Sequence, residues 1–283
     1  MGQGVGVQVY FLTLPHPDKM SNHPATAIRY LRFRLRARSE YDLHSPFVFG
    51  FWSQVLTDNA FYEEYGIIEK LRAKLLKDRS LIHVTDLGAG AGDGVSRQKI
   101  ALVRKIIKNS SVTPSWGRLL FRMARYFRPA VMVELGTSLG MSTAYLAIGN
   151  PLGKVTSIEG CPETAAIAKR NFGILGLDNI QQETAPFEEI LPGLLEKLGK
   201  VDLFFIDGNH RKEPSLQYFH QCLQHIRDDS VVILDDIHWS VEMEEAWKAI
   251  QEHPSVTLTI DLFRMGLVFF KEGLSREDFV LHF

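Results

Sequence analysis

The chain has 283 residues, of which 45% are hydrophobic and 23% are charged, and 32 basic against 33 acidic residues give a formal net charge of −1. This composition excludes a disordered protein, and the balanced charge gives no global attraction for nucleic acid. No apolar stretch approaches the ~20 residues of a membrane span, and two cysteines cannot build a disulfide framework or a four-thiolate zinc site, so we expect a soluble, cytoplasmic protein.

The amino-terminal part is expected to be an appendage to a larger domain. Residues 1–20 have no basic residue ahead of their short apolar run and no small-residue cleavage site, so they do not resemble a secretory signal. We expect them to form an extension with little structure, and we interpret Met20 as a plausible native start. Residues 21–127 are expected to form a mainly helical cap.

Helical patterns dominate this cap. Ser45 followed by Pro46 is a natural cap and first-turn pair, which predicts that a helix starts there. Hydrophobic residues spaced by three and four predict a helix over 63–77, and the region 95–127 shows the same pattern. The aromatic-rich start of the cap supplies candidate substrate contacts, namely His44, Phe47, Phe49 and Trp52.

After residue 129, short β-branched or aromatic runs alternate with longer helical patterns, which predicts a parallel sheet with helices on both faces. The last two strands are joined by only residues 262–265, too few for a crossover helix, so this pair is expected to be antiparallel. We therefore predict a doubly wound, Rossmann-like α/β domain over 128–273 with a tail at 274–283. The seven candidate strands are 131–135, 155–159, 179–184, 201–207, 231–235, 257–261 and 266–271.

Two glycine-rich loops compete for a ligand, one at 86–94 and one at 134–142. In a nucleotide loop, glycines let the backbone approach the ligand, and an acidic residue at the end of the next strand holds the ribose. Only the second loop is followed by such a strand, which ends at Glu159. The first loop is expected to be a turn or lid near the site, or plain surface structure. Neither loop has the dinucleotide or the triphosphate signature.

The second loop, together with Ile158-Glu159, resembles the class I S-adenosylmethionine-dependent methyltransferases, and within them the O-methyltransferases related to the catechol and caffeoyl-coenzyme A enzymes. The resemblance covers 116–271 and implies S-adenosylmethionine as cofactor. It implies that Gly136 and Gly140 admit the methionine part and that Ser142 faces its carboxylate at a helix start. Glu159 is expected to bind both ribose hydroxyls. The other cofactor-binding residues that it implies are Glu134, Thr137, Ser138, Ala185, Phe187 and Asp207.

One departure from that family concerns adenine. In the relatives, the strand before 187–192 ends in Gly followed by a small or acidic residue that contacts adenine, whereas this chain has Ala185-Pro186. Because proline has no backbone N–H, the contact is expected to come from Thr184, Phe187 or Glu188 instead.

Carboxylates follow two neighbouring candidate strands. Asp207 comes after one and Asp235-Asp236 after the next, so both groups are expected at the carboxyl edge of the sheet. Three converging carboxylates repel one another unless a cation or a proton neutralises them, and Mg²⁺ or another divalent cation prefers oxygen ligands. We therefore predict Asp207, Asp235 and Asp236 as metal ligands. The alternative is that they cap helices or hold loops without metal.

The family resemblance also implies a base. Its metal-dependent members carry an Asp at the first strand tip, an Asp-Asn pair at the second, and a lysine three residues after the first Asp. Here Asp236 replaces the Asn, and His210 stands in place of the lysine. An imidazole can accept a hydroxyl proton near neutral pH, so His210 and Asp207 are the predicted catalytic residues.

These inferences predict an S-adenosylmethionine-dependent methyltransferase that acts on an oxygen of a small molecule, with a divalent metal and a homodimer as open options. The alternatives are a non-catalytic S-adenosylmethionine-binding or scaffold protein and a nicotinamide-dependent oxidoreductase. His238 and Trp239, after the second strand tip, are expected to line the acceptor site or to cover the core.

Overall fold

The computed structural model describes residues 24–39, 42–86, 97–273 and 275–283. The predictions for residues 1–20, for Met20 and for nearly all of the loop at 86–94 therefore lie outside the described residues. Within the described ranges, the helices are too short or too polar to cross a membrane.

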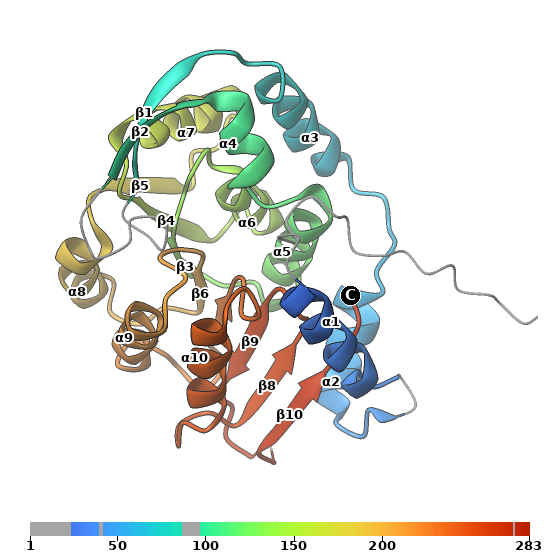
Figure 1. Ribbon diagram of the computed structural model, residues 1–283. Coiled ribbons are helices and arrows are strands. Elements are labelled where there is room, and N and C mark those ends of the chain that lie inside the picture. The colour runs from blue at the N-terminus through green and yellow to red at the C-terminus, as the bar shows by residue number, and fades with distance from the viewer. Residues whose placement is uncertain (1–23, 40–41, 87–96, 274) are drawn as a thin grey trace, which may run out of the picture.

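Eight strands form the main sheet of the described chain, in the order β10-β8-β9-β7-β6-β3-β4-β5 (Figure 1). β9 runs antiparallel to β7 and β8, and the other neighbouring pairs are parallel. This confirms the predicted doubly wound, Rossmann-like fold and its antiparallel strand. The strands are β3 (Val131–Leu135), β4 (Lys154–Glu159), β5 (Ile180–Thr184), β6 (Leu203–Ile206), β7 (Val231–Leu234), β8 (Leu258–Asp261), β9 (Gly266–Phe269) and β10 (Glu277–Val280).

The sheet has one strand more than the seven predicted. β10 lies in the predicted tail and pairs in parallel with β8. An isolated bridge between Arg38 and Leu281 continues this edge toward the amino-terminal helices. The four residues of β10 are half charged and half apolar, with no alternating pattern, so they carry no strand signal of their own. The strand forms because Phe279 is buried in the core beside β8.

Both faces of the sheet are covered by helices, so successive residues of a strand enter two different cores. In β6, Leu203 and Phe205 belong to one core, whereas Phe204 and Ile206 belong to the other. α5, α6 and α7 lie on the first side, and α8, α9 and α10 lie on the second (Figure 1). Their bounds are α5 (Pro114–Phe127), α6 (Met141–Gly149), α7 (Pro162–Leu175), α8 (Phe187–Leu198), α9 (Lys212–Leu223) and α10 (Val241–Gln251).

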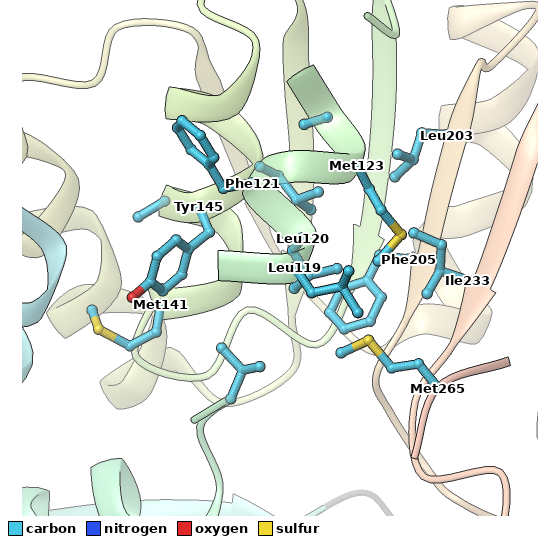
Figure 2. Close-up of a cluster of buried hydrophobic side chains, with 14 of the residues drawn as sticks. Leu119, Leu120, Phe121, Met123, Met141, Tyr145, Leu203, Phe205, Ile233 and Met265 are labelled. Carbon is cyan, nitrogen blue, oxygen red and sulfur yellow. The ribbon is translucent and has the colours of Figure 1, made fainter. Parts of the chain in front are cut away.

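α5 joins α6 to the sheet. Its buried face is strongly apolar, and Figure 2 shows Met123 beside Phe205 and Ile233 of the sheet. On its other side, an ideal Cβ at Gly117 would lie 2.1 Å from the ring of Tyr145 in α6. Because only glycine permits this approach, the two helices pack closely, and the start of α6 is held at the carboxyl edge of the sheet.

The predicted cap is largely helical, and it shares the first core with the sheet. Val48 and Ile68 belong to the same buried cluster as Phe205. Ser45 caps its helix as predicted, since its Oγ accepts the N–H of Val48 at 3.4 Å. The elements are α1 (Pro24–Arg36), α2 (Pro46–Phe51), a π-helical turn (Trp52–Leu56), α3 (Glu63–Leu75) and α4 (Val103–Asn109).

The prediction of helix from residue 95 onward is wrong at its start. β1 (Leu81–Asp86) and β2 (Arg97–Leu102) form a separate antiparallel pair. This ribbon lies against α7, where the carboxylate of Glu163 accepts the N–H of His83 at 2.8 Å. Pairing across the ribbon therefore decides the conformation of 97–102, whereas α4 begins only at Val103.

Candidate functional site

The glycine turn after β3 is shaped by two positions that require glycine. Gly136 has a φ of 105°, and an ideal Cβ there would lie 2.2 Å from the carbonyl oxygen of Asp207. Gly140 has a φ of 84°, and its Cβ would lie 2.5 Å from the ring of Phe172. Both the backbone conformation and the space therefore exclude larger residues. The turn passes close to the tip of β6 and leads into α6.

Glu159 links the end of β4 to this turn. Its Oε2 accepts the N–H of Ser138 at 2.7 Å, and its Oε1 accepts the N–H of Cys161 at 2.9 Å. Burial raises the pKa of Glu159, although the backbone N–H groups around it act in the opposite direction. A carboxylate has about four lone-pair sites, so each oxygen can accept a further hydroxyl. The fold therefore fixes Glu159 beside the turn, as the sequence predicted.

Glu134 lies beneath the turn and is completely buried. It accepts hydrogen bonds from the hydroxyls of Thr143 in α6 and Ser157 in β4. Burial raises the pKa of Glu134 and outweighs the hydroxyl groups of Ser142, Ser157 and Thr143, which favour its charged form. Its Oε1 has no hydrogen-bond partner among the described residues. Glu134 thus joins β3, β4 and α6, and a direct contact with a cofactor stays a prediction.

A shallow hollow lies beside the turn. Three of its residues come from the α4–α5 connection, which the sequence did not single out. Arg72 of α3 holds this connection, because it donates to the carbonyls of Val112 at 2.8 Å and Ile107 at 3.1 Å. The Ser111 hydroxyl is buried without a partner among the described residues. The lining residues are Ser110, Ser111, Val112, Gly136, Thr137, Ser138, Met141, Ser142 and Asp207.

The two predicted catalytic residues meet at the tip of β6. The Nε2 atom of His210 lies 3.6 Å from Oδ1 of Asp207 and 4.0 Å from Oδ2 of Asp236. Ser138, His210 and Asp236 all have positive φ without being glycine. Such conformations are strained and tend to gather at functional sites, and here they surround the carboxyl edge of the sheet.

The predicted metal ligands have a different partner. Arg264, in the β8–β9 turn, donates Nε to Oδ1 of Asp235 at 2.8 Å and Nη2 to Oδ2 at 2.6 Å. Its Nε also lies 3.7 Å from Oδ1 of Asp236. Burial would lower the pKa of Arg264, but the carboxylates of Asp235, Asp236 and Asp207 outweigh it and raise that pKa.

The three aspartates therefore do not fit a divalent cation as predicted. Both oxygens of Asp235 are taken by a guanidinium, and the Asp235 side chain is fully buried. In the described part of the chain, no group of three or more His, Cys, Asp or Glu side chains is arranged to hold a metal ion. The sequence missed Arg264 because it lies about 30 residues after its partner, in a hairpin turn without a motif.

The predicted substrate contacts of the cap are at the wrong edge. The ring of Phe47 lies 5.0 Å from that of Phe269, which pairs with Val231 at the start of β7. Phe51 stacks on Phe127 at 5.8 Å, just before β3 begins. The segment 44–52, with His44, Phe49 and Trp52, therefore lies at the amino ends of the parallel strands, opposite the site. The segment lies there because its apolar side chains are buried against the sheet.

Both ring nitrogens of His238 face carboxylates of this protein. Its Nδ1 lies 2.9 Å from Oε1 of Glu244, and its Nε2 lies 2.9 Å from Oδ2 of Asp261. The ring also stacks on Phe263 at 5.2 Å. Both nitrogens are thus engaged, so His238 does not offer them to an acceptor. Trp239 is 47% exposed and stays a candidate wall.

The segment predicted near adenine closes one side of the site. The N–H of Ala185 donates to the carbonyl of Glu159 at 3.1 Å. An ideal Cβ at Gly208 would lie 2.4 Å from the ring of Phe187, which also meets Tyr218 edge-on at 5.8 Å. Phe187 therefore lies against the backbone that follows Asp207, and its contact with a cofactor stays a prediction.

Comparisons with known proteins agree with this geometry. A family model described as a methyltransferase domain matches residues 133–237, a span that contains the turn, Glu159 and both strand tips. Catechol O-methyltransferase of Niastella koreensis is 30% identical over 158 residues, which are 55% of this chain and 71% of that protein. The Mycobacterium tuberculosis protein of the same name is 30% identical over 129 residues, 45% of this chain and 57% of the relative.

Solved structures show the same fold at lower identity. The Bacillus cereus O-methyltransferase in complex with SAH is 19% identical, with a TM-score of 0.51, and the match covers 84% of this chain and 99% of that one. An SAH-bound methyltransferase of Podospora anserina is 16% identical, with a TM-score of 0.52 and coverage of 76% and 99%. The chain belongs to the class I S-adenosylmethionine-dependent O-methyltransferases, in the family of the catechol O-methyltransferases.

Proposed function

We propose that this chain binds S-adenosylmethionine across the glycine turn and transfers its methyl group to an oxygen of a small molecule. The observation that carries the proposal is the joint geometry of Gly136, Gly140 and Glu159. Two glycines let the turn pass close to the tip of β6 and to α7, and a fixed carboxylate stands at the end of the neighbouring strand. This is the arrangement that a nucleoside with a charged tail requires.

The hollow is assigned to the amino-acid end of the cofactor. Ser142, in the first turn of α6, lines it, and helix amino ends favour a carboxylate. The buried hydroxyl of Ser111, which also lines the hollow, supplies a further donor. Thr137 and Ser138 complete this end of the site.

The nucleoside end is assigned to Glu159 and to the segment after β5. Glu159 accepts the two ribose hydroxyls with the lone pairs that Ser138 and Cys161 do not use. Ala185 and Phe187 then border the adenine, with Phe187 supplying an aromatic surface next to Gly208. Glu134 acts from below by holding the turn and α6 in place.

Methyl transfer to a hydroxyl oxygen requires mainly that the two reactants are correctly oriented and that one group accepts the hydroxyl proton. When bound, the cofactor supplies an electrophilic methyl group on a sulfonium, so the protein has to orient an acceptor oxygen toward it. His210 is positioned to take the acceptor's hydroxyl proton, and the carboxylates of Asp207 and Asp236 stabilise the imidazolium that forms. Nε2 of His210 would hold the acceptor's proton during this transfer.

Calorimetry with SAH and with NAD tests this proposal. We expect SAH to bind with one site per chain and NAD not to bind. Transfer of a labelled methyl group to catechols and related hydroxylated compounds then tests the activity. Binding of NAD alone would support an oxidoreductase, and binding of SAH without transfer to any acceptor would support a scaffold.

A further inference from the structure

We propose that Arg264 is the resident cation of the strand-tip carboxylates and takes the place that a divalent metal ion would otherwise have. The inference rests on the proposed function only in placing the acceptor at this edge of the sheet. Asp207 and Asp235 directly follow two strands that pair side by side, β6 and β7. Arg264 reaches Asp235 from the β8–β9 turn, and Asp207 lies close enough to act on its charge.

The pair with Asp235 uses the oxygens that a metal would need. Nε and Nη2 of Arg264 meet Oδ1 and Oδ2 of Asp235 at 2.8 Å and 2.6 Å, the parallel fork that guanidinium and carboxylate groups form best. The Asp235 side chain is inaccessible to solvent, and that of Arg264 is only 11% exposed. A metal ion would have to displace this largely buried guanidinium from both oxygens of Asp235. The displaced charge would then repel the ion.

The remaining carboxylate belongs to the same arrangement. Oδ1 of Asp236 lies 3.7 Å from Nε of Arg264, and Oδ2 of Asp236 lies 4.0 Å from Nε2 of His210. Asp236 therefore stands between the arginine and the predicted base. Arg264 thereby neutralises part of the negative charge that surrounds the predicted base.

Arg264 is held in this position by its surroundings. Its carbonyl accepts the N–H of Ile237, which directly follows Asp236, at 3.1 Å. The preceding residue, Phe263, has a φ of 70°, a conformation that turns the chain sharply before Arg264. The guanidinium carbon lies 5.9 Å from the centre of the Trp116 ring in α5. The charge is therefore preorganised, and no rearrangement is needed to use it.

Binding of Mn²⁺ to the full chain tests the proposal without cofactor or acceptor. Wild-type protein is expected to show no site-specific Mn²⁺ binding by calorimetry and no change in melting temperature with either Mn²⁺ or a chelator. Arg264→Gln frees the carboxylates, so it is expected to bind one Mn²⁺ and to gain several degrees in melting temperature with that ion. The gain should disappear in the double variant Arg264→Gln/Asp207→Asn.

Arg227→Gln is the matched control. Arg227 pairs with Asp202 at 2.5 Å, at the amino end of β6, and its removal should create no Mn²⁺ site. Arg264→Lys keeps the charge without the fork and should also bind no Mn²⁺. If Arg264→Gln does not fold, the proposal is tested by the Mn²⁺ titrations of the wild type and of Arg264→Lys, and both proteins are expected to bind no Mn²⁺. Wild-type binding of one Mn²⁺ that Asp235→Asn abolishes would overturn the proposal, as would a folded Arg264→Gln protein that binds none.

Because these titrations use only the metal, they are independent of the proposed reaction. If the wild-type protein does not bind SAH, the proposed function is contradicted, whereas the Mn²⁺ result still stands. A wild-type Mn²⁺ site would contradict the role of Arg264 and leave SAH binding intact. In active protein, turnover unchanged by a chelator is the further expected result.

Discussion

Glu159 is the residue on which cofactor binding is expected to depend most. Glu159→Gln removes a charge that accepts two backbone N–H groups and, in the proposed complex, two ribose hydroxyls. We expect SAH affinity to fall by about 1–3 kcal/mol, roughly 5–150-fold in Kd, measured by calorimetry. Glu196→Gln, exposed on α8, is the control and should bind as wild type. Equal affinities for the two variants would contradict the assignment of the ribose.

His238 is expected to make stability depend on pH. Burial alone would lower its pKa, but Asp261 and Glu244 outweigh burial and raise the pKa above the ordinary value of 6.5. Glu244 also pairs with Arg29 of α1, at 3.1 Å. A raised pKa in the folded state stabilises the protein below the ordinary pKa, and this contribution disappears as pH rises through the folded value.

The melting temperatures of wild type and His238→Gln, measured from about pH 5.5 to about pH 9, test this sign. The advantage of the wild type should be largest at the acidic end of this range and should shrink as the imidazole loses its proton. An advantage that grows with pH would show that the neutral ring is the stabilising form.

Residues in local motifs could be predicted, and residues joined by the fold could not. Gly136, Gly140 and Glu159 are separated by one strand–helix–strand unit, and this spacing alone indicates a shared site. Arg264 reaches the site by its hydrogen bonds to Asp235, which follows another strand, and Ser111 lies in the connection between α4 and α5. Neither carries a motif, because their positions are set by how separate elements pack.

At the scale of elements, the contact of α5 with α6 determines where the turn begins. Gly117→Ala would place a methyl group 2.1 Å from the Tyr145 ring, so the helices must move apart. We expect the free energy of unfolding to fall by about 1–3 kcal/mol, measured by urea denaturation. Gly193→Ala in α8 is the matched control, because nothing lies within 4 Å of its Cβ, and alanine should stabilise that helix by up to about 1 kcal/mol. Equal effects at both positions would contradict this packing argument.

Elements with strong periodicity were predictable, whereas short edge strands were not. β6 and β7 are continuous apolar runs and were predicted within one or two residues. β2 and β10 contain charged residues, and each forms because a partner strand is available. A pattern search within one segment cannot detect a strand whose stability comes from its neighbour.

At the scale of the whole molecule, the shared core predicts a single unfolding transition. Phe51 of α2 is fully buried in the core that also contains the sheet residues. Phe51→Ala should lower the stability of the entire chain by about 3–5 kcal/mol without splitting the transition. Phe61→Ala, 85% exposed, is the control and should change little. Circular dichroism and tryptophan fluorescence should coincide in urea, and two separate transitions would show that the cap folds independently.

The fork between Arg264 and Asp235 also bears on which molecules this enzyme can modify. A bound metal selects substrates by chelation, so it favours compounds with two neighbouring oxygens. A guanidinium already locked onto an aspartate has no open coordination positions to offer. In the proposed arrangement, recognition is expected to depend on shape and on one ionisable hydroxyl, so the rate of methyl transfer to an isolated phenol should match that to the corresponding vicinal diol.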